Sequence, residues 1–297
     1  MAVTRRRALG VFAAIGAGIA GLGGLVRTLG SPAPRPQVVE GTTRTRESYG
    51  DLPRQRGEWW VPPAGSSPTG LLPTVVLVHG GYWRSQFGPD LEDAVAADLA
   101  GRGFLVWNVD YRPSSDPWPA TLSDVALAFD HTAKGRYADR VDRDRLAVVG
   151  HSAGGHLALW LASRARVPVG GPGARPTLPA PTLVVAQAPV AGLAEGALLG
   201  LGGGAVQALL GGTPASVPER YAAADPSALL PTGVRSVLVH ADDDDLVPIS
   251  QSTGYVAAAT AAGDDSRLVR VDGGHLGHLD PASSAVAALR SALAGSS

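Results

Sequence analysis

Short apolar runs rich in β-branched residues recur along the chain and alternate with segments of helical spacing. The runs that predict strands span residues 75–78, 105–109, 146–149, 183–186, 237–239 and, more weakly, 268–271. Runs of this length, bounded by turn residues, fit strands that are buried on both faces of a sheet. The helical segments span residues 90–100, 123–134, 153–164, 250–262 and 283–293. This alternation predicts an α/β fold with a mostly parallel central sheet and helices on both faces.

Two segments interrupt the alternation. Residues 168–181 are rich in glycine and proline, which predicts a loop. Residues 191–212 consist mainly of glycine, alanine and leucine, and they lie where a cap or lid could be inserted before the strand at 237. No internal repeat is found, so we expect one catalytic domain.

The N-terminal thirty residues differ from the rest of the chain. The run Arg5-Arg6-Arg7 precedes an apolar stretch, residues 8–26, that carries no charge. A basic segment followed by an apolar run is typical of an export signal, and the paired arginines resemble a twin-arginine signal. A membrane anchor is the alternative, because about 20 apolar residues can span a bilayer. Six glycines in that stretch weaken it as a stable helix.

These features divide the chain into three parts. Residues 1–30 are expected to be an export signal or membrane anchor, 31–57 a linker and N-terminal extension, and 58–297 the catalytic domain. We therefore expect an exported protein, associated with a membrane through residues 1–30 if at all. Whether this segment is cleaved stays open, because no clear cleavage site follows it.

Composition narrows the function classes. The chain is 45% hydrophobic and 17% charged, which is enough apolar material for a sizeable core. A formal net charge of −1 and the lack of a basic stripe argue against nucleic-acid binding. The chain has no cysteine, which excludes disulfides, thiolate catalysis and thiolate metal sites.

The strongest local signal for chemistry is Gly150-His151-Ser152-Ala153-Gly154. A predicted strand leads into this G-x-S-x-G motif and a predicted helix follows it, which is the context of a nucleophile elbow. Glycines on either side of the serine suit a turn so sharp that a Cβ would collide. Ser152 is therefore the candidate nucleophile, and the Ala153 N–H is a candidate oxyanion donor at a helix start. The alternative is a glycine-rich turn without function.

A second signal, His79-Gly80-Gly81-Tyr82-Trp83, follows the first strong strand. In nucleophile-elbow hydrolases this loop supplies further oxyanion donors, so the N–H groups of Gly81 and Tyr82 are candidates. His79 precedes the serine, whereas the triad order with such an elbow is serine, then acid, then histidine. We therefore expect His79 to brace the loop rather than to catalyse.

The acid and the base must follow Ser152 in the chain. The run Asp242-Asp243-Asp244-Asp245 ends a predicted strand, and on chemistry alone each carboxylate is a candidate, with the other three in a solvated turn. His275 lies in a glycine-rich loop after the last strand and suits the base, with His278 as its rival. His156 lies one helical turn past the serine and is expected to pack against the elbow helix.

Several of these motifs together resemble the kynurenine formamidase and small carboxylesterase branch of the α/β-hydrolases. The resemblance covers roughly residues 59–289 and rests on four stretches: 79–84 (HGGYWR), 110–112 (DYR), 150–158 (GHSAGGHLA) and 274–281 (GHLGHLDP). It implies the α/β-hydrolase fold and carries the base to His275. The stretch 240–248 resembles H-G-x-x-D-x-x-V-P, a register that places the acid at Asp244. Ala241 stands for the usual glycine and Leu276 for the usual phenylalanine.

The function expected from these residues is that of a serine hydrolase acting through a Ser152–His275–Asp244 acyl-enzyme mechanism on a small-molecule ester or amide. Such a mechanism calls for no metal or organic cofactor. The resemblance leaves a carboxylesterase and an arylformamidase that cleaves N-formylkynurenine as alternatives. Because tryptophan catabolism is cytosolic, the export signal favours the esterase. The alternative from another class is a non-catalytic binding protein that keeps the fold.

Overall fold

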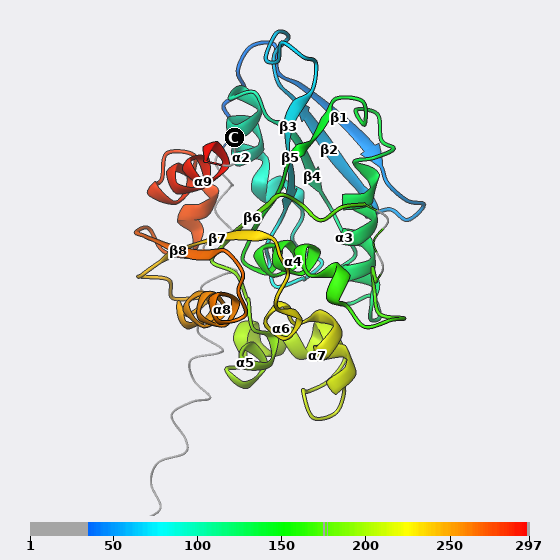
Figure 1. Ribbon diagram of the computed structural model, residues 1–297, viewed down its shortest axis with the longest axis vertical. Helices are drawn as coiled ribbons and strands as arrows, with labels where there is room; N and C mark the ends of the chain where they lie inside the picture. Colours follow the sequence, from blue (N-terminus) through cyan, green and yellow to red (C-terminus); the bar gives the residue numbers. More distant parts are fainter. Residues whose placement is uncertain (1–34, 175, 177, 296–297) are drawn as a thin grey trace, which may run out of the picture.

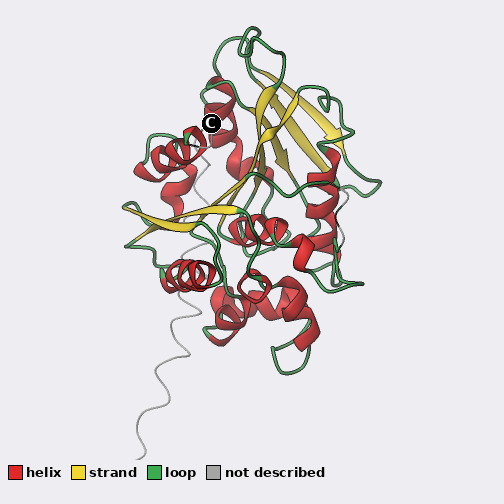
Figure 2. Cartoon of the chain, in the orientation of Figure 1, coloured by secondary structure: helices red, strands yellow, loops and turns green. Residues whose placement is uncertain are grey.

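Eight strands form a single sheet in a computed structural model, which describes residues 35–174, 176 and 178–295 (Figures 1 and 2). The strand order is β1-β2-β4-β3-β5-β6-β7-β8. The pairs β1–β2 and β2–β4 are antiparallel, and every other neighbouring pair is parallel. The strands are β1 (Thr43–Ser48), β2 (Arg56–Val61), β3 (Leu72–Val78), β4 (Leu105–Val109), β5 (Val141–His151), β6 (Leu183–Gln187), β7 (Arg235–Ala241) and β8 (Ser266–Val271).

Helices cover both faces of this sheet. One face packs on α2 and α9, and the other packs on α3, α4 and α8 (Figure 1). The side chains of β3 alternate between the two cores, with Val76 and Val78 in one and Val75 and Leu77 in the other. This alternation follows from the two-residue period of a strand. The helices are α2 (Asp93–Gly101), α3 (Ala120–His131), α4 (Ala153–Ala162), α8 (Ser250–Ala261) and α9 (Ser284–Ala294).

The predicted α/β architecture is confirmed, and the six predicted strands correspond to β3 through β8. The sheet nevertheless begins earlier than the expected domain start at residue 58, because residues 43–48 form β1 and β2 starts at Arg56. Strand β1 is an edge strand whose residues are mostly exposed, and it alternates threonine with arginine. Such a strand carries no apolar run, so the hydrophobic pattern did not reveal it.

The predicted cap segment folds into short helices at the carboxyl end of β6, at the bottom of Figure 1. Residues 191–212 form most of this region, and a further helix, α7, was not predicted. The glycine run is left-handed at Gly200, Gly202, Gly203 and Gly204. The cap helices are α5 (Leu193–Leu198), α6 (Leu201–Leu210) and α7 (Pro218–Ala224). Short 3₁₀ turns complete the chain: η1 (Pro89–Glu92), η2 (Arg164–Arg166), η3 (Pro226–Leu229) and η4 (His275–Leu279).

The expected export signal or anchor, residues 1–30, lies outside the described residues. Within residues 35–295, apart from the gaps at 175 and 177, no helix is long and apolar enough to cross a membrane.

A carboxyl group without a partner is buried beside the sheet. Glu92 ends η1, is 0% exposed, and neither of its carboxyl oxygens finds a hydrogen-bond partner in the described part of the chain. Burial, with a smaller contribution from the charge of Asp93, raises the pKa of Glu92 to about 8. The carboxyl is therefore neutral at pH 7, which avoids placing an unpaired charge in the core.

The variant Glu92→Gln should be more stable than the parent protein at alkaline pH and about equally stable at pH 5. The pKa of Glu92 is 4.5 in the unfolded chain and about 8 in the folded chain. In the window between these two pH values only the native state holds the proton. The free energy of unfolding therefore falls as pH rises through it, by about 1.4 kcal/mol per pH unit and a few kcal/mol in all. Glutamine removes this slope, which urea unfolding at pH 5, 7 and 9 measures.

Exposed Glu219 provides the matched control, since its side chain is 70% accessible. Glu219→Gln should leave the pH dependence of the parent protein unchanged. If Glu92→Gln kept the same pH dependence too, the buried carboxyl would not be the group that titrates.

Candidate active site

The candidate nucleophile lies at a sharp turn between β5 and α4. Ser152 has φ 58° and ψ −119°, a backbone conformation that side-chain-bearing residues rarely adopt. Its N–H donates to the carbonyl of Gln187 at the end of β6, at 2.8 Å. The residue is 2% exposed. The strand, turn and helix of a nucleophile elbow are thus all present.

The two glycines of the motif are required by close packing at this turn. A Cβ on Gly150 would collide with the carbonyl of Gly154, and a Cβ on Gly154 would collide with the carbonyls of Val78 and His79. The obstructing atoms are backbone and cannot move aside as a side chain could. The elbow therefore lies directly against the end of β3, where the candidate oxyanion loop begins.

Among the four consecutive aspartates, Asp244 is the one that the fold buries. Its Oδ2 accepts a hydrogen bond from Nδ1 of His275 at 2.7 Å, and its Oδ1 accepts from the N–H groups of Leu246 and Val247, each at 2.9 Å. The Asp244 side chain is 0% exposed, whereas the neighbouring residues 242, 243 and 245 are exposed. Because an ionised carboxylate only accepts, the proton of His275 is on Nδ1 and Nε2 is left as an acceptor.

The environment of Asp244 keeps it ionised. Burial on its own would raise the pKa of this carboxyl, but hydrogen bonds from His240 and His275 and from the Val247 N–H hold it well below its usual range.

Sequence reasoning had assigned no role to His240. Its Nε2 lies 3.3 Å from Asp244 Oδ2, and its Nδ1 is 2.7 Å from Oγ of Ser252. Its position as the first residue of the 240–248 motif was the signal in the sequence that could have identified His240 as a site residue.

The loop that carries the candidate base is attached to the elbow. Nε2 of His151, the residue before Ser152, donates to the carbonyl of His275 at 2.9 Å, and the two rings lie 4.6 Å apart. His278, the rival base, packs against His151 at 5.5 Å, but its two ring nitrogens have no hydrogen-bond partner within the described residues. Burial, together with the charge of His275, lowers the pKa of His278 to about 3. The carboxylate of Asp244 thus pairs with His275 and not with His278.

The candidate oxyanion loop packs against the same elbow in an unusual backbone conformation. Gly81, Tyr82 and Trp83 have φ values of 108°, 51° and 54°. A Cβ on Gly80 would lie 3.1 Å from that of Ser152, so the loop and the nucleophile are in contact. Throughout the described residues, the N–H groups of Gly81, Tyr82 and Ala153 donate to no other protein group. All three are therefore free to donate to a bound oxyanion.

Two histidines that we expected to brace the site are held by structural contacts. Nδ1 of His79 is hydrogen-bonded to the carbonyl of Gly80 at 2.8 Å, and its ring stacks on Tyr111 at 4.3 Å. Nε2 of His156 donates to the carbonyl of Ala224 at 2.9 Å. Within the described residues, neither imidazole pairs with Asp244 or with the Ser152 side chain; the one link is from the backbone N–H of His156 to the carbonyl of Ser152, at 3.1 Å.

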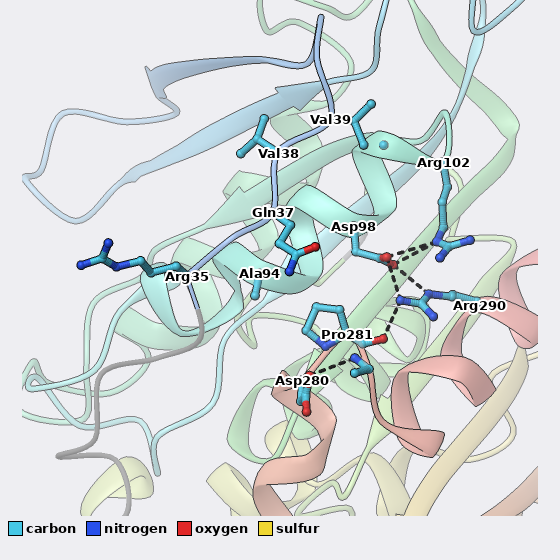
Figure 3. A pocket seen from close by; sticks show the side chains of 12 residues that line it. Arg35, Gln37, Val38, Val39, Ala94, Asp98, Arg102, Asp280, Pro281 and Arg290 are labelled. Atoms are coloured by element: carbon cyan, nitrogen blue, oxygen red, sulfur yellow. Dashed lines mark hydrogen bonds and ion pairs between the residues drawn. The ribbon is translucent and has the colours of Figure 1, made fainter.

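A separate cavity of about 750 Å³ lies between the N-terminal segment 35–39, α2 and α9 (Figure 3). Asp98 lies in it between Arg102 and Arg290 and binds both guanidinium groups. None of the predicted site residues lines this cavity. The described residues also contain no cluster of histidine and acidic side chains that could hold a metal ion.

Comparisons with solved structures relate this arrangement to known folds. Esterase B from Lactobacillus rhamnosis, solved with a tributyrin phosphonate inhibitor, superposes with a TM-score of 0.75 at 20% identity over 97% of both chains. A carbohydrate esterase from gut microbiota superposes with a TM-score of 0.73 at 19% identity, over 87% of this chain and 98% of that one. The BD-FAE family model, which describes α/β-hydrolase esterases, matches residues 60–169. The chain therefore has the fold of the α/β-hydrolases.

Several sequence relatives of this chain are named as esterases. Carboxylesterase NlhH of Mycobacterium tuberculosis is 41% identical over 103 residues, which cover 34% of this chain and 32% of NlhH. Esterase LipI of the same species is 31% identical over 173 residues, covering 50% of this chain and 52% of LipI. The chain therefore matches only about a third to a half of the length of these relatives. The BD-FAE match contains the oxyanion loop and the elbow but ends before Asp244 and His275.

Proposed function

We propose that this α/β-hydrolase cleaves carboxylic esters of small molecules through a Ser152–His275–Asp244 acyl-enzyme mechanism. The observation that carries the proposal is the 2.7 Å hydrogen bond between His275 and the buried Asp244, on a loop bound to the Ser152 elbow through His151. This pair leaves Nε2 of the imidazole as the acceptor that activates a serine. The esterase names of the relatives support an ester as the substrate.

The mechanism follows from the positions of these groups. Nε2 of His275 takes the proton of Ser152 as Oγ attacks the acyl carbon, while Asp244 stabilises the imidazolium that forms. The N–H groups of Gly81, Tyr82 and Ala153 donate to the oxyanion of the tetrahedral intermediate, where a single donor is worth about 10²–10³ in kcat. His275 then returns the proton to the leaving alcohol. Water activated by the same imidazole releases the acid and restores the serine.

The full-length protein is expected to hydrolyse short p-nitrophenyl esters and to react with a fluorophosphonate probe at a single serine. Both results follow from an activated Ser152, and mass spectrometry of the labelled peptide identifies the residue. The same preparation tests the formamidase alternative through the ratio of kcat/KM for N-formylkynurenine to that for the ester, which should lie well below one. A ratio far above one would instead make the protein an arylformamidase with the same mechanism.

A folded sample that neither turns over esters nor reacts with the probe would contradict the proposal and favour a binding protein on this fold. Circular dichroism of the same sample establishes that the protein is folded. Unfolded protein is thereby distinguished from folded protein without activity.

We further propose that the protein is exported, with residues 1–30 as the signal or anchor. Support comes from the arginines at positions 5–7 and the uncharged apolar stretch that follows them. These residues lie outside the described part of the chain, so this proposal rests on the sequence alone.

A further inference from the structure

Tyr82 takes a backbone conformation that normally favours glycine. Its φ of 51° lies in the left-handed region, and it is followed by Trp83 in the same region. A side chain in this position is strained unless its surroundings hold it there. The Tyr82 side chain is almost completely buried, at 3% exposure, so its contacts offer a reason for the strain.

The hydroxyl of Tyr82 connects the oxyanion loop to the acid loop. It donates to the carbonyl of Leu246 at 3.1 Å, across 164 positions of sequence. The N–H of that same Leu246 donates to Asp244 Oδ1. Burial raises the pKa of Tyr82 to about 12, so the hydroxyl keeps its proton and remains a donor at neutral pH.

The ring of Tyr82 also supports the glycine run of the cap. A Cβ added to Gly202 would lie 2.6 Å from Cδ1 of the ring, so only a glycine can lie this close at that position. Arg84, two residues further along the oxyanion loop, donates to the carbonyl of Gly202 at 2.5 Å. Gly202 of the cap therefore contacts the oxyanion loop at both Tyr82 and Arg84.

We propose that the Tyr82 side chain is a positioning residue that locks three separate segments together: the oxyanion loop, the acid loop and the cap. This inference rests on the proposed function, in which the Tyr82 N–H donates to the oxyanion. The hydroxyl bond to Leu246 orients the backbone of residue 82 relative to the Asp244–His275 pair. The contact with Gly202 makes that orientation depend on the position of the cap.

The variant Tyr82→Phe tests the hydroxyl bond without changing the shape of the ring. One hydrogen bond of ordinary strength predicts a kcat about 5- to 10-fold lower. KM should stay within about twofold, because the oxyanion donors act in the transition state and not on the bound ester. The Ki of an aryl trifluoromethyl ketone, which forms a tetrahedral adduct with the serine, should rise in proportion to the loss of kcat/KM.

Tyr221 supplies the matched control for this variant. Its hydroxyl also donates to a carbonyl, that of Gly212, at 3.2 Å, and both residues belong to the cap region. Tyr221→Phe should leave kcat within about twofold of the parent protein. Similar kcat values for Tyr82→Phe and Tyr221→Phe would overturn the inference.

The contact with the cap is tested by a pair of glycines in the same run. Gly202 and Gly200 have φ values of 59° and 65°, so alanine suffers similar backbone strain at either position. A Cβ at Gly200 meets nothing within 4 Å, whereas a Cβ at Gly202 would lie 2.6 Å from Cδ1 of the Tyr82 ring and 2.9 Å from Cβ of Ala205. Gly202→Ala should therefore lower kcat at least about 10-fold more than Gly200→Ala, a difference equivalent to ~1.4 kcal/mol.

A double-mutant cycle separates this effect from a general disturbance of the cap. In a Tyr82→Ala background both obstructing ring atoms are gone while the contact with Ala205 remains, so the difference in kcat between Gly202→Ala and Gly200→Ala should become clearly smaller. Equal kcat values for the two alanine variants in the parent background, or an undiminished difference in the Tyr82→Ala background, would overturn the inference. Thermal unfolding midpoints show whether each variant is folded at the assay temperature.

Failure of the inference and failure of the proposed function give different results. If the parent protein is not labelled by the fluorophosphonate probe, the proposed function fails and takes this inference with it. If the parent protein is labelled and hydrolyses esters, the Tyr82 and Gly202 variants decide the inference alone.

Discussion

The variant Ser152→Ala should lower kcat for a p-nitrophenyl ester by about 10⁵–10⁶-fold. In the proposed mechanism the side-chain oxygen of Ser152 forms the acyl-enzyme, so its loss removes the covalent route. The elbow should persist, because alanine fits where serine fits and the close contacts that shape the turn involve Gly150 and Gly154. Burst-phase kinetics and probe labelling should vanish together, while circular dichroism should match that of the parent protein.

A second buried serine, at the other end of helix α4, serves as the control. Ser163 follows α4, is 0% exposed, and its Oγ donates only to the carbonyl of Leu159, at 2.8 Å. Ser163→Ala should keep kcat within about threefold of the parent value. If the folded Ser152→Ala variant retained more than about 1% of the parent kcat, another nucleophile would have to carry the reaction.

The variant Asp244→Asn should lower kcat by about 10⁴-fold. Asparagine has the same shape, and its carbonyl oxygen can still accept from the N–H groups of Leu246 and Val247. Its amide group, however, donates to Nδ1 of His275, which moves the imidazole proton to Nε2. A protonated Nε2 cannot accept the proton of Ser152. The loss should appear in kcat at every substrate concentration, and the free enzyme should bind the ester normally.

The neighbouring carboxylate Asp242 makes a strict comparison. It is exposed and, among the residues that the structure describes, its carboxylate pairs only with Arg270, at 2.7 Å, an interaction at the surface that contributes little to stability. Asp242→Asn should therefore leave kcat within about twofold of the parent value. A larger loss in Asp242→Asn than in Asp244→Asn would assign the acid to a different member of the run.

Local signals account for the features that could be predicted. The strand, the turn and the helix around Ser152 are neighbours in sequence, so the residues that build the elbow also reveal it. The strands β3 to β7 are recognisable because strands buried on both faces are largely apolar, whereas β8, a partly exposed edge strand, carries only a weak apolar run. Strand β1 lacked this pattern because most of its residues face solvent. The short helix α7 was missed as well, and its start signals are Pro218 at its first position and Glu219 in its first turn.

The sequence by itself determined the fold class and the nucleophile candidate Ser152, since the strand, turn and helix of the elbow are neighbours in the chain, and the family resemblance placed the acid at Asp244. Only the tertiary structure showed that this side chain is buried against His275 while the other three aspartates are exposed, because burial depends on how the loop after β7 turns and not on residue type. Only the tertiary structure, too, brought Tyr82 to the carbonyl of Leu246. Contacts between distant segments form when the sheet places strand ends side by side, and no local pattern encodes them.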